Sequence, residues 1–131
     1  MGKVEARFII EIAGHPKGHV EEVMKKVVER IKGDKEVIAY QIFEAKEVKN
    51  LWSTFTEMDV GFEDIPEVFG FCYDQLPSSV EILKPKEISL DYGKLSDMVN
   101  DLLAKLHELD STTKNLKATN ILLQKKLKEK G

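Results

Sequence analysis

Few side chains in this 131-residue sequence combine the types and spacings that carry out chemistry. The most suggestive segment is 15–19, His-Pro-Lys-Gly-His, which places two imidazole groups four residues apart. If both histidines were helical, they could share a metal ion with Glu11 or Glu22 as the third ligand. Pro16 and Gly18 favour a turn instead, so we expect neither a metal nor another cofactor. The candidates for binding a small ligand in this loop are His15, Lys17, Gly18 and His19.

The remaining reactive side chains predict no catalytic residue. Glu57 and Asp59 alternate along one strand face and could bind a hard cation or a basic partner, although a solvated strand face is the simpler interpretation. Cys72 falls on the apolar stripe of an expected helix, which makes it a small core residue rather than a nucleophile. The sequence holds no Gly-x-Ser-x-Gly, no phosphate-binding glycine loop and no His-Glu-x-x-His. We therefore expect a protein that is not an enzyme; a small enzyme whose site is shared between subunits is the alternative.

Charge divides the chain near Tyr92 and Gly93. Residues 1–93 hold 12 basic and 18 acidic residues, a net charge of −6, whereas residues 94–131 hold 8 lysines and 5 acids, a net charge of +3. Only the total, −3, is close to neutral. Because the negative N-terminal part repels phosphates, we do not expect nucleic-acid binding.

Cysteine content and hydropathy bear on the compartment. Cys72 is the single cysteine, so no internal disulfide can form, and the reducing cytoplasm is the expected location. No run approaches the ~18 consecutive apolar residues of a membrane-spanning helix, so no membrane partner is expected. The charged residues are mostly lysine and glutamate, a composition that leans towards a thermophilic source.

Residues 1–92 predict a small α+β domain. Apolar residues alternate with the period of a strand in four segments, 4–12, 36–47, 52–62 and 79–84. An amphipathic helix is expected at 20–31, where apolar residues recur at i, i+3 and i+4. A second helix, capped by Asp64 and ended by Pro77, is expected to bury Ile65, Val68, Phe69, Cys72 and Leu76. The element order is therefore β-α-β-β-α-β.

This order resembles the ferredoxin-like fold, in which two crossovers interleave into a four-stranded antiparallel sheet with both helices on one face. The loop at 15–19, between the first strand and the first helix, is similar in position to the ligand-binding loop of ACT-type regulatory domains. The resemblance implies a ligand-responsive domain with a small-molecule site at this loop. His15 stands where those domains carry an acidic residue ahead of the proline, so amino-acid binding is in doubt.

Both faces of the expected sheet carry apolar residues. The helix-covered face can be supplied by Val4, Phe8, Ile10, Trp52, Met58 and Val60. Ile9, Phe55 and Leu83 have the opposite parity and point to the second face. Because a solvated face alternates more cleanly, we expect this second face to be partly covered by the C-terminal helix, by a second subunit's sheet or by a ligand.

The C-terminal segment 93–131 predicts a long coiled-coil helix. Between Gly93 and Gly131 it holds no proline and no other glycine. Apolar residues recur there at alternating spacings of four and three, the heptad repeat that supercoils helices around one another. The a and d positions of this repeat are Leu95, Val99, Leu102, Leu106, Leu109, Thr113, Leu116, Asn120, Leu123 and Leu127.

Oligomerisation through this helix is the strongest functional expectation. Leucine fills every d position, and a single asparagine, Asn120, occupies an a position, a combination that favours a parallel dimer. A trimer, an antiparallel pair and a hetero-bundle are left open. We therefore expect a homo-oligomeric interaction or scaffold protein, in which the domain at 1–92 binds other proteins and the helix at 93–131 sets the assembly.

Overall fold

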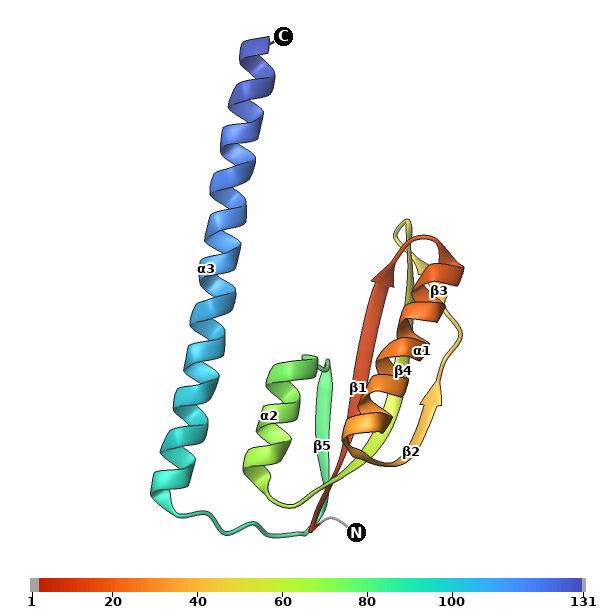
Figure 1. Cartoon of the computed structure of the whole chain (residues 1–131), viewed down its shortest axis with the longest axis vertical. Helices are drawn as coiled ribbons and strands as arrows, with labels where there is room; N and C mark the ends of the chain where they lie inside the picture. Colours follow the sequence, from red (N-terminus) through yellow and green to blue (C-terminus); the bar gives the residue numbers. More distant parts are fainter. Residues whose placement is uncertain (1–2, 131) are drawn as a thin grey trace. The chain divides into compact units, whose positions relative to one another are not determined.

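The computed structural model describes residues 3–130 and separates the chain into two compact units, with the boundary between Ser89 and Leu90. We call the first unit the body; the second consists of one long helix, α3 (Tyr92–Lys130) (Figure 1). The elements of the body are, in chain order, β1 (Val4–Gly14), α1 (Lys17–Asp34), β2 (Glu36–Ile42), β3 (Lys46–Val48), β4 (Leu51–Phe62), α2 (Ile65–Gln75) and β5 (Ser79–Lys84).

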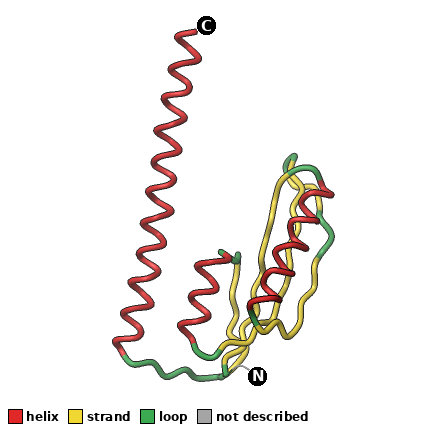
Figure 2. The backbone as a smooth tube through the Cα atoms, viewed as in Figure 1, coloured by secondary structure: helices red, strands yellow, loops and turns green. Residues whose placement is uncertain are grey.

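The strands of the body form one antiparallel sheet in the order β2-β4-β1-β5, and the short β3 pairs with the start of β4 (Figure 2). This confirms the α+β class expected from the sequence, and the order of the four long strands is consistent with the ferredoxin-like fold. The expected number of strands was wrong by one, because the sequence predicts four and the structure has five.

The fifth strand arises because the chain leaves β2 earlier than expected. The sequence predicts one continuous strand here, but β2 ends at Ile42. Ala45 then turns inward, with its side chain buried and its N–H donating to the Glu21 carboxylate of α1 at 3.2 Å. Lys49 and Asn50 have positive φ angles of 49° and 71°, as a type I′ turn requires. The turn lets β3 pair with β4 as a hairpin.

One face of the sheet carries the core. Phe8 of β1 is fully buried, and its ring packs against Phe62 of β4 and Phe71 of α2, with centroids 5.9 and 4.4 Å apart. Trp52, which the sequence places on this face, is only half-buried. Helix α1 contributes four buried side chains at helical spacing, Val20, Met24, Val28 and Ile31. The buried strand residues are Val4, Ala6, Phe8, Ile10, Thr54, Thr56, Met58, Val60 and Phe62.

Helix α2 buries Ile65 and Val68 as expected, but the rest of its buried face is rotated from the expected position. Asp64 caps it as predicted, accepting a backbone N–H of the first turn at 3.1 Å. The sequence pattern favours Phe69 and Cys72 as buried residues, but both are half-buried and Phe71 is buried in their place. Leu76 is exposed, since it ends the helix in the left-handed conformation. The ring contacts of Phe71 with the strands explain this rotation of the helix.

The other face of the sheet, the open face, carries no helix of the body. Its centre is charged, because Arg7 binds Asp59 on the neighbouring strand through two hydrogen bonds of 2.8 and 3.1 Å. Apolar residues gather at one end, where the rings of Phe43 and Phe55 stack with centroids 4.4 Å apart. The open face is therefore divided into a polar zone and an aromatic zone.

Phe8 is the residue whose loss is expected to disturb this core most. Phe8→Ala should lower the free energy of unfolding by about 3–5 kcal/mol, because it removes a ring that contacts two others and leaves a cavity. Urea denaturation measures the loss. Val48→Ala, at an exposed apolar position, is the control and should change stability by no more than about 0.5 kcal/mol. Equal effects of the two substitutions would contradict the described core.

Candidate functional site

Helix α3 is one uninterrupted helix of 39 residues. The Asp91 carboxylate caps its start by accepting the Lys94 N–H at 2.8 Å. Residues 94–130 hold no proline and no glycine, so nothing in the sequence breaks the backbone hydrogen bonds of the helix. At about 1.5 Å per residue, α3 is about 58 Å long.

The a and d residues of the heptad repeat form what we call the heptad stripe: Leu95, Val99, Leu102, Leu106, Leu109, Thr113, Leu116, Asn120, Leu123 and Leu127. Its eight aliphatic side chains are each between 40% and 72% exposed. Within the described residues, the second unit contains no other helix or strand against which they could pack. This row of exposed apolar side chains is the candidate interaction surface of the chain.

Two polar residues interrupt the heptad stripe, with different consequences. The Thr113 hydroxyl donates to the Leu109 carbonyl of its own helix at 2.9 Å, so it needs no partner from outside. The Asn120 amide makes no hydrogen bond within residues 3–130. Because an asparagine at an a position can bond to its counterpart on a second helix, Asn120 is the residue of the stripe that a partner helix would satisfy.

The candidate ligand loop lies between β1 and α1. His15 precedes α1 and His19 lies in its first turn, and both side chains are exposed. A side chain added at Gly18 would meet no atom within 4 Å. Over residues 3–130, no group of three His, Cys, Asp or Glu residues lies close enough to hold a metal ion. The structure therefore gathers no ligand set around the two histidines.

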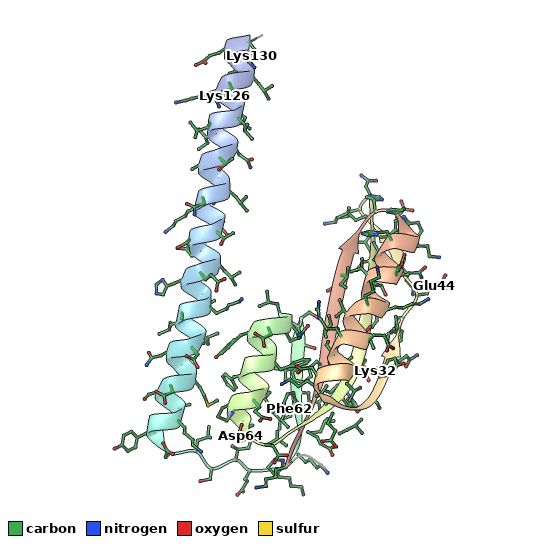
Figure 3. All side chains as sticks on the ribbon, viewed as in Figure 1. Lys32, Glu44, Phe62, Asp64, Lys126 and Lys130 are labelled. Carbon is green, nitrogen blue, oxygen red and sulfur yellow. The ribbon has the colours of Figure 1, made fainter. Side chains whose placement is uncertain are left out.

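Lys17 joins this loop to the rest of the body. Its Nζ lies 2.8 Å from Glu44 Oε1 and 5.4 Å from the centroid of the Trp52 ring; Glu44 is labelled in Figure 3. The hydrogen bond between the two side chains raises the pKa of Lys17 and lowers the pKa of Glu44 from their ordinary values. The structure thus brings Lys17 to a carboxylate and an aromatic ring, and not to either histidine.

A hollow of about 440 Å³ on the open face lies outside the sites that the sequence predicts. Its lining comes from β1, the β2–β3 connection, β3 and β4, and consists of Glu11, Phe43, Glu44, Lys46, Val48, Ser53 and Phe55. The Ser53 hydroxyl donates to Glu11 at 3.2 Å. A largely apolar lining with a few polar groups is typical of small-molecule sites of this size. Ser53 and Phe55 are two residues apart, so the sequence places them on the same face of their strand. This signal indicates a hollow only when the β3 hairpin beside them is known.

The acidic pair on β4, Glu57 and Asp59, already contacts a cationic side chain, Arg7. Arg7 Nε lies 2.8 Å from Asp59 and 3.6 Å from Glu57. These carboxylates raise the pKa of Arg7 further above its ordinary value, chiefly through the hydrogen bond that Arg7 donates to Asp59. The guanidinium therefore occupies the place that a bound metal ion or basic partner would take.

Cys72 lacks the surroundings of a reactive cysteine. Its side chain is half-buried, and this burial raises the pKa of the thiol. A raised pKa reduces the thiolate fraction at neutral pH, and the thiolate is the nucleophilic form. The raised pKa of the thiol therefore gives no sign of a nucleophile, although the side chain is less buried than the sequence predicts.

The family of the chain follows from a family model that matches residues 5–130. The chain belongs to the MJ0538 family. The match spans residues of both the body and α3. No curated protein matches the chain, and no solved structure does. Over residues 3–130, no helix is both long and apolar enough to cross a membrane.

The ion pair of Lys17 with Glu44 predicts a small pH dependence. The pKa of Glu44 is lowered from 4.5, so its contribution to stability is complete above that value and is lost as the pH falls through the lowered pKa. Glu44→Gln should therefore destabilise the protein slightly at pH 7, and the difference from the wild type should disappear in acid, once the pH has fallen below the lowered pKa of Glu44. Urea denaturation at pH 7 and in acid measures it.

The matched control for this substitution is Glu47→Gln. Glu47 is a nearby exposed carboxylate that makes no ion pair within residues 3–130, so its replacement should leave stability unchanged at both pH values. A loss of stability in Glu44→Gln that persists undiminished in acid would show that the ion pair does not act as described.

Proposed function

We propose that this member of the MJ0538 family is a non-enzymatic interaction protein that self-associates through α3. In this proposal, the heptad stripes of two copies pack as a parallel coiled-coil dimer, and the body binds other proteins. The observation that carries the proposal is the exposure of eight heptad-spaced aliphatic side chains on a helix with no second helix in its own unit. The single cysteine supports a cytoplasmic location as part of the same proposal.

The length of the heptad stripe favours a stable pairing. From Leu95 to Leu127 it extends over about 48 Å at 1.5 Å per residue. Fully burying a leucine or valine side chain stabilises a protein by about 1.5–3 kcal/mol, and 40–72% of each aliphatic side chain is still accessible to water. Packing against a second stripe removes this area from water in nearly five successive heptads, which is enough to offset the entropy of association.

Asn120 is the main determinant of a parallel orientation. In a parallel pair, Lys105 of one helix faces Asp110 of the other. Both side chains are already engaged within their own helix, because Lys105 lies 3.9 Å from Glu108 and Asp110 lies 2.9 Å from Lys114. The charged residues beside the stripe therefore select orientation weakly. The parallel, in-register arrangement is therefore favoured over the others mainly by the hydrogen bonding of two Asn120 amides.

A ligand-responsive regulatory domain is the second candidate function, and the open-face hollow favours it. Glu44 lines this hollow and binds Lys17 of the candidate loop, so a ligand in the hollow would act on the loop through one carboxylate. Thermal-shift measurements with metal ions, amino acids and nucleotides test the candidate. A rise in Tm that is lost in Lys17→Ala and Phe55→Ala but kept in Lys26→Ala supports it; no rise with any compound contradicts it.

Sedimentation of substituted chains tests self-association. The wild-type chain is expected to sediment as a dimer at micromolar concentration. Leu106→Glu combined with Leu109→Glu should give a monomer, because pairing would bury two carboxylates per helix opposite the same two carboxylates of the other copy. Leu122→Glu, at an exposed apolar position outside the stripe, should remain dimeric. A monomeric wild-type chain, or loss of the dimer in the control alone, would contradict the proposed function.

Replacing Asn120 tests the orientation argument. Asn120→Leu should raise the thermal midpoint, because it exchanges a polar a residue for an apolar one, and should allow trimers or antiparallel pairs to form beside the dimer. Asn115→Leu, which lies on the same helix outside the stripe, should do neither. Calorimetry and sedimentation report the two effects. An unchanged midpoint with an unchanged dimer would remove Asn120 from the interface.

A further inference from the structure

The second half of α3 is strongly basic. Residues 111–130 hold six lysines and one acid, Glu129, a net charge of +5. The first part of the helix, 92–110, holds two lysines and four acids, a net charge of −2. Figure 3 shows the labelled Lys126 and Lys130 on the last turns of this basic half.

Four of these lysines form a stripe around one exposed isoleucine. Counting 3.6 residues per turn, they lie within about 40° of Ile121 around the helix axis and span about 21 Å along it. Ile121 is 56% exposed and lies outside the heptad stripe. We call this surface the lysine stripe; its members are Lys114, Lys117, Ile121, Lys125 and Lys128.

The helix dipole does not account for the lysine stripe. Lysines are stabilised by the dipole within the last turn of a helix, which here concerns only Lys128 and Lys130. Lys114 pairs with Asp110 at 2.9 Å. Lys117, Lys125 and Lys128 make no ion pair within residues 3–130. Most of the charge on this surface is therefore uncompensated.

Self-association does not supply the missing negative charge. In a parallel pair in register, g residues of one helix face e residues of the other, so Lys117 at an e position faces the neutral Thr112. The one acidic residue at these flanking positions, Asp110, faces Lys105. A second copy in register therefore brings no carboxylate to Lys117, and Lys125 and Lys128 lie outside the e and g positions.

From this arrangement we infer that the lysine stripe is a docking surface for an acidic amphipathic helix of another protein, with an apolar side chain of that helix packed on Ile121. The four lysines lie four and seven residues on either side of Ile121, so carboxylates four and seven residues on either side of an apolar residue of the partner would match them. An apolar residue at the centre of the partner would bury Ile121, as in other helix-recognition surfaces.

A nucleic acid fits this surface less well. Residues 94–130 hold no arginine and no phenylalanine, tyrosine or tryptophan, the side chains that most often read or stack on bases. An exposed isoleucine between the lysines finds no apolar partner on a phosphate backbone. Residues 1–93 add a charge of −6 to the same chain, which opposes the approach of a polyanion.

Titration of the full-length chain with two synthetic peptides tests the inference. The first is a helical peptide with glutamates at i±4 and i±7 around one central leucine, and the second carries alanine in place of this leucine at the same charge. Fluorescence anisotropy should show that the first binds about tenfold more tightly, because only it buries an apolar side chain on Ile121. The affinity of both should fall as salt is added.

Matched substitutions on α3 locate the binding surface. Lys117→Glu with Lys125→Glu should weaken binding of the leucine peptide by at least about tenfold, whereas Lys126→Glu with Lys130→Glu, about 140–180° away around the helix, should weaken it by less than about threefold. Ile121→Ala should abolish the difference between the two peptides, and Leu122→Ala should preserve it. All of these positions are exposed and the new residues favour helix, so helix content and sedimentation should not change.

Several results would overturn the inference. The first two are equal affinity for the two peptides and an equal loss of affinity in the two charge-reversal pairs. The third is tighter binding of duplex DNA or single-stranded RNA than of the leucine peptide. The last is assembly beyond the dimer at low salt that Lys117→Glu abolishes. The last would assign the lysine stripe to a second copy of the chain. Because the lysine stripe and the heptad stripe occupy different sides of α3, a failure here leaves the sedimentation test of self-association intact.

Discussion

The exposure of the heptad stripe to water is the constraint on which this account of the protein depends. A single helix of 39 residues satisfies its backbone by itself, but it has no means of burying a row of leucines along one side. In proteins, a helix owes most of its stability to the packing of such an apolar face against other elements. The second unit contains only this helix among the described residues, and under the proposed function a partner helix buries these apolar side chains. The uninterrupted spacing of the stripe and the asparagine at Asn120 then restrict what that partner can be.

The body differs from α3, because it buries its apolar core by itself. Phe8, Phe62 and Phe71 form an aromatic cluster between the sheet and α2, and α1 adds four buried aliphatic or thioether side chains. On the open face, the ion pair of Arg7 with Asp59 keeps the centre hydrated. The stacked rings of Phe43 and Phe55 leave one end apolar and hollow. The chain thus separates a domain that buries its own core from a helix whose heptad stripe is exposed.

The sequence predicted best those features that depend on near neighbours in the chain. The heptad repeat from Leu95 to Leu127, the Asp64 cap and the strand at Ser79–Lys84 all follow from local spacing, and α3, that cap and β5 are present. Features that depend on distant residues were missed. The break after Ile42 depends on the Glu21 carboxylate of α1, and the burial of Phe71 depends on rings contributed by β1 and β4. The open-face hollow requires both the β3 hairpin and the position of Phe43, so no local pattern could reveal it. The partner of Lys17 is Glu44, 27 residues away, and its place beside the candidate loop could be known only from the fold.

Disulfide cross-linking at one position of the heptad stripe tests the central claim most directly. In a Cys72→Ser background, Leu116→Cys places a thiol at a d position near the middle of the stripe. If two copies pair in parallel and in register, mild oxidation should convert most of this variant to a covalent dimer, because equivalent d residues then lie opposite each other. Asn115→Cys, one residue away and outside the stripe, should remain largely monomeric after denaturation. Equal cross-linking of the two variants, or none in Leu116→Cys, would contradict association through the heptad stripe.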